Sequence, residues 1–381
     1  MSNNLFLSYS VSCLVALALF PSCRGGGSAA ISQVGGDTVP MDYAKRITIV
    51  DYPQYTFASI QNPWDTTKVL HNYVLVPDSI DLPDSLPEGT VIRTPLKRTI
   101  VHSSVHCKLI GDLGAYEAIK GVCDSEYIHL PEIVSGLEDG SVVDCGVNTS
   151  PDIEKVVSLS PDAILLSPYQ DGGTYGKLTT LPIAIVECAD YMEISPLARA
   201  EWIKFYGRLY GKTETADSLF DAVELKYNSL KSKTADVKVR PGVLFDRLYG
   251  RQWYVPAAMS TISTLIRDAG GSNPFESITG SGSAPLSAEQ VLVQAGEVPY
   301  WLVRYSSPET MTLKELSADN KVYSKFDAFK TGNVYGCNTG VVRYYENAPF
   351  HPERILYDII SIIHPELVDS VPTQTFFTRL K

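Results

Sequence analysis

Two glutamates occupy equivalent places in two similar stretches of the chain. Residues 148–166 and 286–303 each contain a polar capping residue, a short apolar helix, a break and an apolar strand without alternation. Glu154 and Glu289 fall in the first helical turn of these stretches. A carboxylate in that position either complements the partial positive charge of the helix N-terminus or offers an anion to a cationic partner.

Other residues with chemical potential are sparse. His102, His106 and Cys107 lie within six positions of one another and raise the question of a transition-metal site. The chain has only six histidines and no histidine-rich loop, so we predict no metal site and no cofactor. The sequence contains no nucleophile elbow, P-loop, dinucleotide-binding fingerprint or zinc-protease motif. We therefore predict that the protein is not an enzyme, and a tethered hydrolase or chelatase remains the competing class.

The elements that position the two glutamates predict the fold. A short helix that leads into an apolar strand is one step of a parallel α/β sheet, and two distant steps indicate two similar lobes. We predict an α/β fold with two Rossmann-like lobes, a rigid helical connector and a small N-terminal β appendage. The predicted segments are a signal peptide (1–22), a lipoprotein tether (23–45), the β appendage (46–95), the N-terminal lobe (96–194), the connector helices (195–235) and the C-terminal lobe (236–381).

Apolar spacing supports the connector. Trp202, Phe205, Tyr206 and Leu209 recur every three or four residues after Ser195-Pro196, a typical helix start. A second helix with the same periodicity follows a break at residues 211–213. Because this helical pair lies between the two βα series, it is expected to join the lobes.

Composition narrows the class of partner. The chain has 381 residues, of which 44% are hydrophobic and 20% charged, so it can form a sizeable core. Its net charge is −11, without a long basic run, which argues against nucleic acid as a partner because phosphate binding needs clustered Lys and Arg.

The N-terminus is typical of an exported protein. Residues 1–22 carry no charged side chain, and residues 11–20 form an apolar run that is too short to span a bilayer. Cys23 and a small, glycine-rich segment follow, as in a bacterial lipoprotein cleavage site. We expect lipidation of Cys23, membrane anchoring and a periplasmic location; an ordinary secretory signal is the alternative.

Several short motifs, in order, resemble the substrate-binding proteins of ABC importers for iron–siderophore chelates and cobalamin. They are the strand and helix at residues 98–115, the segment Gly121-Val122-Cys123-Asp124, the turn Gly270-Gly271-Ser272-Asn273 and the element at residues 326–335. The resemblance covers about residues 96–381. It implies a monomer with a ligand in a cleft between the lobes, and an ABC permease partner that Glu154 and Glu289 dock onto.

The resemblance also implies that the loops after the strands form the cleft. These loops are rich in tyrosine and arginine, which suit flat macrocycles and anionic chelates. The expected ligand-binding residues are Ser103, Ser104, His106, Tyr169, Arg247, Tyr249, Arg251, Trp253, Tyr254, Arg304, Arg343, Tyr344 and Tyr345. We expect an iron–siderophore chelate first, cobalamin or another corrinoid second, and haem third.

Overall fold

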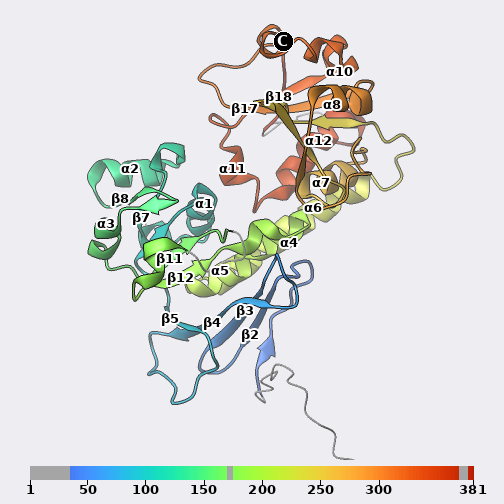
Figure 1. Ribbon diagram of the computed structural model, residues 1–381. Coiled ribbons are helices and arrows are strands. Elements are labelled where there is room, and N and C mark those ends of the chain that lie inside the picture. Colours follow the sequence, from blue (N-terminus) through green and yellow to red (C-terminus); the bar gives the residue numbers. More distant parts are fainter. Residues whose placement is uncertain (1–34, 170–174, 369–375) are drawn as a thin grey trace, which may run out of the picture. The chain divides into compact units, whose positions relative to one another are not determined.

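The computed structural model describes residues 35–169, 175–368 and 376–381. It confirms the predicted α/β fold class: two lobes with parallel sheets, which we call the N-lobe and the C-lobe, are linked by helices (Figure 1). A separate sheet is formed by the segment that precedes the N-lobe.

The N-lobe is built on a five-stranded parallel sheet of order β12-β11-β6-β7-β8. All four residues of β11 are buried, as expected for a strand whose two faces are both covered. The elements are β6 (Thr99–Val101), α1 (Ser104–Asp112), β7 (Ile119–Val122), η2 (Ser125–Tyr127), α2 (Pro131–Asp139), β8 (Val143–Asp144), α3 (Ile153–Ser158), β11 (Ala163–Leu166) and β12 (Ala184–Glu187).

The C-lobe repeats this plan with a sheet of order β13-β17-β18-β19, in which only β19 is antiparallel. A small antiparallel sheet, β14-β15-β16, adjoins it. The elements are β13 (Val243–Phe245), β14 (Leu248–Tyr249), β15 (Gln252–Pro256), α7 (Thr261–Asp268), β16 (Ser283–Leu286), α8 (Ala288–Ala295), β17 (Tyr300–Tyr305), α9 (Leu313–Asp319), α10 (Asp327–Lys330), β18 (Val334–Asn338), α11 (Tyr344–Asn347), α12 (Pro352–Ile363) and β19 (Thr378–Arg379).

The connector consists of α4 (Pro196–Glu201), α5 (Ile203–Leu209) and α6 (Thr213–Lys233). One face of α6 is buried at three- and four-residue spacing, and this face packs on α5 and on α12 of the C-lobe. The connector is therefore not a free linker. It is part of the main hydrophobic core, which also contains residues of both lobes.

A five-stranded sheet precedes the N-lobe. Its strands β1 (Asp37–Thr38), β2 (Ile47–Asp51), β3 (Thr56–Gln61), β4 (Val69–Pro77) and β5 (Thr90–Thr94) lie in sequence order, and only the β4–β5 pair is parallel. The hydroxyl of the buried Tyr73 donates to the carbonyl of Ile185 (3.1 Å) and accepts from the N–H of Glu187 (2.9 Å). The sheet is thus bonded to the edge strand of the N-lobe.

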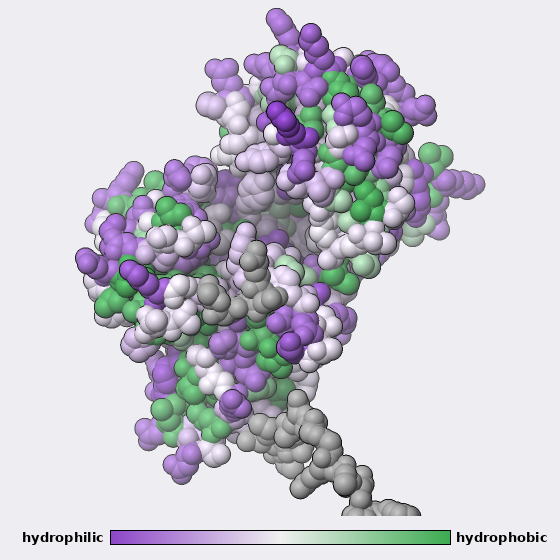
Figure 2. Space-filling model, viewed as in Figure 1, coloured by the Kyte–Doolittle hydropathy of each residue, from purple (hydrophilic) through white to green (hydrophobic). Residues whose placement is uncertain are grey.

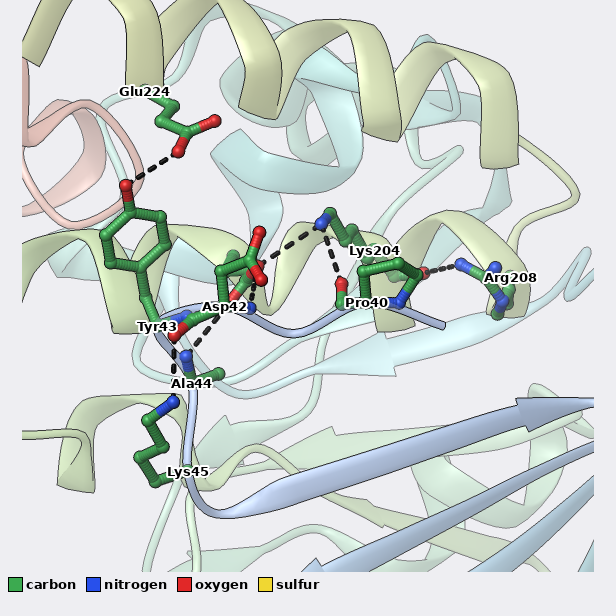
Figure 3. A network of polar contacts seen from close by, with 9 residues as sticks. Pro40, Asp42, Tyr43, Ala44, Lys45, Lys204, Arg208 and Glu224 are labelled. Carbon is green, nitrogen blue, oxygen red and sulfur yellow. Dashed lines mark hydrogen bonds and ion pairs between the residues drawn. The ribbon is translucent and has the colours of Figure 1, made fainter. Parts of the chain in front are cut away.

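The segment before β2 is held by hydrogen bonds to the rest of the fold, and this corrects the predicted tether. Figure 3 shows one of them, from Nζ of Lys204 in the connector to the carbonyl of Pro40 (2.9 Å). Glu201 accepts hydrogen bonds from three consecutive N–H groups, those of Asp42, Tyr43 and Ala44. Glu193 accepts from the N–H groups of the next two residues, Lys45 and Arg46. A tether through residue 45 was predicted, but residues 37–45 are part of the fold, because buried acids supply partners for backbone that sequence alone leaves unpaired.

Three features of the described part of the chain bear on function. No helix within it has the length and apolar character needed to cross a membrane. No group of three or more His, Cys, Asp or Glu side chains within it is placed to hold a metal ion. Its five cysteines, Cys107, Cys123, Cys145, Cys188 and Cys337, are buried free thiols.

Candidate functional site

A cavity of about 780 Å³ lies between the N-lobe and the C-lobe. Figure 2 shows a hollow between the two lobes that is covered by residues of intermediate hydropathy. This volume is in the range of pockets that enclose a drug-sized ligand. The lining residues are Ser103, Ser104, Val105, Tyr127 and His129 from the N-lobe, and Asp246, Arg247, Leu248, Tyr249, Tyr254, Arg304, Tyr305, Ser306, Thr339, Gly340, Tyr345 and Glu346 from the C-lobe.

The N-lobe contributes the start of a helix. Strand β6 ends at Val101, and α1 begins three residues later with Ser103 as its cap, so the first turn of α1 reaches the cavity. The Ser103 hydroxyl accepts a hydrogen bond from the N–H of Val105 (3.2 Å). Parallel α/β sheets place ligands at the carboxyl ends of their strands, and the cavity follows this rule.

The C-lobe contributes the ends of three parallel strands. Asp246 and Arg247 follow β13, Arg304 and Tyr305 end β17, and Thr339 follows β18. Because β13, β17 and β18 are neighbours in the sheet, residues far apart in sequence meet at one edge.

An ion pair fixes the arginine at the centre of this edge. The Nε of Arg304 donates to Oδ1 of Asp246 (2.8 Å), and a second guanidinium nitrogen donates to Oδ2. The guanidinium also lies over the rings of Phe245, Tyr344 and Tyr345, at 5.1, 5.3 and 5.9 Å. Burial lowers the pKa of Arg304, but the hydrogen bonds and charge of Asp246 outweigh it and raise the pKa above its ordinary value.

The second arginine of the lining is paired as well. Arg247 forms an ion pair with Asp319 at the end of α9. Arg247 and Arg304 therefore each have an acidic partner, so neither contributes an uncompensated positive charge to the cavity.

Aromatic rings form the exposed part of the wall. Tyr127, Tyr249, Tyr254 and Tyr345 are 67%, 82%, 44% and 50% exposed, although large aromatic side chains are usually more buried. Glu126 raises the pKa of Tyr127 most, and Tyr249 of the opposite lobe also contributes, which places the two phenols near each other across the cavity.

The structure brings some of the predicted ligand-binding residues to the cavity and leaves others out. Those that line it are Ser103, Ser104, Arg247, Tyr249, Tyr254, Arg304 and Tyr345. Those outside the lining are His106, Tyr169, Arg251, Trp253, Arg343 and Tyr344.

Trp253 is a correction, since its side chain is completely buried in the C-lobe core. It lies in β15, where burial alternates between neighbouring residues, and its Nε1 donates to the carbonyl of Phe245 (3.0 Å). Trp253 therefore supports the strand end that carries Asp246 rather than contacting a ligand.

His106 is also a correction. Its ring is buried on the core side of α1, and its Nε2 lies 2.8 Å from Oδ1 of Asp190. Helical spacing explains the difference from Ser104, because His106 follows it by two positions, and residues at that spacing lie on different faces of a helix.

The remaining four residues do not line the cavity either. Tyr344 is buried, and its ring packs edge to face against those of Tyr345 and Phe376. Arg343 caps α11 in a left-handed conformation (φ 51°), and Arg251 lies exposed in the turn between β14 and β15. Tyr169 is exposed, and the residues that directly follow it fall outside the described part of the chain.

Sequence reasoning missed several lining residues, among them Tyr127, His129, Asp246 and Glu346. Asp246 could have been found, because it directly follows the apolar run Val243-Leu244-Phe245, which is typical of a buried strand. Tyr127 and His129 come after β7, and none of the expected ligand-binding residues lies in the segment that follows this strand. Glu346 lies in a four-residue helix that carries no recognisable pattern.

The two glutamates lie where the repeated pattern placed them. Glu154 is in the first turn of α3 and Glu289 in the first turn of α8, and both are exposed. A backbone hydrogen bond and the Ser287 hydroxyl lower the pKa of Glu289. Each lobe therefore presents one of these two carboxylates to solvent.

Comparison with known proteins agrees with this geometry. A sequence profile of the periplasmic binding protein family matches residues 120–339, which is more than half of the chain. The chain belongs to this family. The family predicted from the sequence motifs is thereby confirmed.

Relatives in the archaeon Methanocaldococcus jannaschii cover a similar length. One uncharacterized lipoprotein is 30% identical over 296 residues, which are 75% of this chain and 69% of the relative. A second is 25% identical over 329 residues, which are 82% of this chain and 80% of the relative.

Solved structures share the fold at low identity. A periplasmic heme-binding protein from Pseudomonas aeruginosa has a TM-score of 0.57 at 15% identity, covering 74% of this chain and 96% of its own. The vitamin B12-binding protein of Vibrio cholerae has a TM-score of 0.53 at 15% identity, covering 70% and 96%. An Fe³⁺-hydroxamate transport protein from Saccharomonospora viridis has a TM-score of 0.55 at 15% identity, covering 71% and 94%. Each is matched almost in full, so more than a quarter of this chain has no counterpart in them.

Proposed function

We propose that this protein is the substrate-binding component of an ABC importer and carries a metal chelate, an iron–siderophore or a corrinoid, to the permease. The observation that carries the proposal is the cavity of about 780 Å³ between the two lobes, lined by strand ends and tyrosines. Aromatic rings with polar edges suit a bulky chelate, because they bury a large area while keeping hydrogen-bonding groups available.

The charges in the cavity revise the order of expected ligands. The preference for an anionic iron chelate was based on the arginines of the loops. Since Arg247 and Arg304 are paired with Asp319 and Asp246, they no longer favour an anionic ligand over a neutral one. Neutral and cationic ferric chelates and corrinoids therefore come before anionic chelates.

A titration of the full chain tests the proposal. The probes are a ferric trihydroxamate, a ferric tris-catecholate, cyanocobalamin and haem, with quenching of intrinsic tryptophan fluorescence as the readout. We expect saturable binding of at least one probe, which mass spectrometry then recovers chemically unchanged. Absence of binding by all four probes would refute the proposal, and a chemically altered probe would point to an enzyme instead.

Docking onto the permease is the second part of the proposal. The exposed carboxylates of Glu154 and Glu289 belong to separate lobes, so the distance between them depends on how the lobes are arranged. A receptor with two cationic sites can bind both carboxylates only in a matching arrangement. Replacing both by alanine is expected to abolish uptake and leave chelate affinity unchanged. The matched control is the double alanine variant of Glu117 and Glu297, which are also exposed, one in each lobe. Uptake that survives the first variant would disprove the docking role.

Anchoring through Cys23 and a periplasmic location remain part of the proposal, because Cys23 lies outside the described residues. Relatives that bear the name lipoprotein support it. A lipid-bearing N-terminal cysteine in the intact mass of the mature protein is the expected result, and an unmodified mature N-terminus would contradict it.

A further inference from the structure

One acidic side chain of the cavity lining is not part of an ion pair. Arg247 and Arg304 each have an aspartate partner, Asp319 and Asp246 respectively. The lining contains one more acid, Glu346 of α11. The lining itself holds two arginines and two acids, and Asp319, which is not part of the lining, brings these five side chains to two positive and three negative charges.

Glu346 is buried without a counter-charge. It is only 4% exposed, and no described residue forms an ion pair or a side-chain hydrogen bond with its carboxylate. Its nearest described surroundings include α1, where burial raises the pKa of the Cys107 thiol and Glu346 adds to the effect. The side chain is largely buried, but its carboxylate oxygens are not fully enclosed, so they remain open to the cavity, where a ligand can supply the missing partner.

The other polar features near Glu346 do not supply that partner. The N-terminus of α1 carries a partial positive charge of about half an elementary charge, less than the full charge of a carboxylate. The side-chain oxygen of its capping residue, Ser103, already accepts a bond from Val105. Next to Glu346, Tyr345 exposes half of its surface to the cavity, and an aromatic face attracts cations.

We propose that Glu346 is the residue that determines charge selectivity in this cleft, by pairing with a positively charged or strongly hydrogen-bond-donating group of the chelate. The cleft then accepts cationic and neutral chelates and discriminates against anionic ones. This inference rests on the proposed function and narrows its ligand class.

The test compares probes that differ in charge. The full chain is titrated with a cationic ferric trihydroxamate that bears a free amine, a neutral corrinoid and an anionic ferric tris-catecholate. We expect the cationic chelate to bind at least about tenfold more tightly than the anionic one. The Glu346→Gln variant, which keeps the shape of the side chain, should lose about tenfold or more in affinity for the cationic chelate, because a buried charge loses its partner.

Two further variants keep the test decisive. Glu297→Gln removes the same charge from an exposed site outside the cavity and should change no affinity. Asp246→Asn removes the partner of Arg304 and should raise affinity for the anionic chelate by about tenfold. Thermal unfolding of ligand-free Glu346→Gln should match or exceed wild type, because the substitution removes an uncompensated charge.

The outcomes separate this inference from the proposed function. If the wild-type protein binds chelates but prefers the anionic one, or if Glu346→Gln leaves the ratio of affinities unchanged, the inference is wrong and the transport role stands. If the ligand-free variant unfolds well below wild type, Glu346 has a structural partner and the inference is also wrong. If the wild-type protein binds no chelate of any charge, the proposed function itself fails.

Discussion

Each lobe contains an aspartate that is paired with an arginine, Asp190 with Arg199 of the connector and Asp246 with Arg304, but the surroundings differ. In the N-lobe, Asp190 is fully buried where α1 meets the connector. Its Oδ1 lies 2.8 Å from Nε2 of His106 and accepts a bond from the hydroxyl of Tyr206 (2.9 Å), and its Oδ2 accepts from Nε of Arg199 (3.0 Å). In the C-lobe, Asp246 and Arg304 are about a quarter exposed and border the cavity.

The difference in burial gives the two clusters different roles: the Asp190 cluster stabilises the fold, and the Asp246–Arg304 pair faces the ligand cavity. The ring of His106 packs on Tyr206 of the connector and on Phe350 of the C-lobe, so the Asp190 cluster holds three parts of the molecule together. Such a buried cluster is costly to break because removing one member leaves a charge without a partner. The Asp246–Arg304 pair keeps contact with solvent, so it is available to set the charge that a ligand meets.

The same substitution in both clusters should give very different losses of stability. Asp190→Asn is expected to lower the free energy of unfolding by about 3 kcal/mol, since His106 and Arg199 lose their counter-charge in the core. Asp246→Asn is expected to lower it by about 1 kcal/mol, because solvent compensates the partner. Chemical denaturation of both variants measures the difference. Equal losses would show that the two clusters have the same structural role.

The N-lobe cluster should also give stability a pH dependence that Asp190→Asn removes. Burial raises the pKa of Asp190, but His106 and Arg199 outweigh it and lower the pKa from 3.8 to about 2. Its contribution is present above pH 3.8 and is lost as the pH falls toward 2. For His106, burial lowers the pKa, but Cys188 and Asp190 raise it above 6.5, so its contribution is complete below pH 6.5 and declines at alkaline pH.

The free energy of unfolding should therefore be highest between about pH 4 and 6.5 and fall on either side. The acid limb is expected to cost on the order of 2 kcal/mol, which follows from the size of a carboxyl pKa shift of this kind. Denaturation of wild type and Asp190→Asn over a series of pH values measures it. Parallel pH curves for the two proteins would contradict the assignment to this cluster.

The smallest expected effect concerns the rings at the cavity. Tyr127→Ala and Tyr249→Ala should each weaken chelate binding by about 1 kcal/mol, because stacking on an aromatic ring contributes about that much. Unfolding should not change, since both side chains are mostly exposed. The phenylalanine variants are the controls and should keep most of the affinity. If removing either ring leaves binding intact, the N-lobe and C-lobe do not both contact the ligand.

Much of the scaffold was predictable because local patterns decide it. The apolar spacing of residues 202–230 predicted the buried face of the connector, and short apolar runs predicted the strands of the parallel sheets. The site was only partly predictable. Trp253 was expected in a binding loop, yet the alternating burial of β15 directs it into the core.

The sequence by itself determined the two α/β lobes, the helical connector and the strand ends at which polar side chains gather, because each depends on residues close together in the chain. Only the tertiary structure decided the charge of the cleft. Asp246 and Arg304 are 58 positions apart, and Arg247 and Asp319 are 72 apart, so their pairing depends on which strand and helix ends meet. The same packing places Glu346 at the cavity without a partner, since a counter-charge must be near in space rather than in sequence.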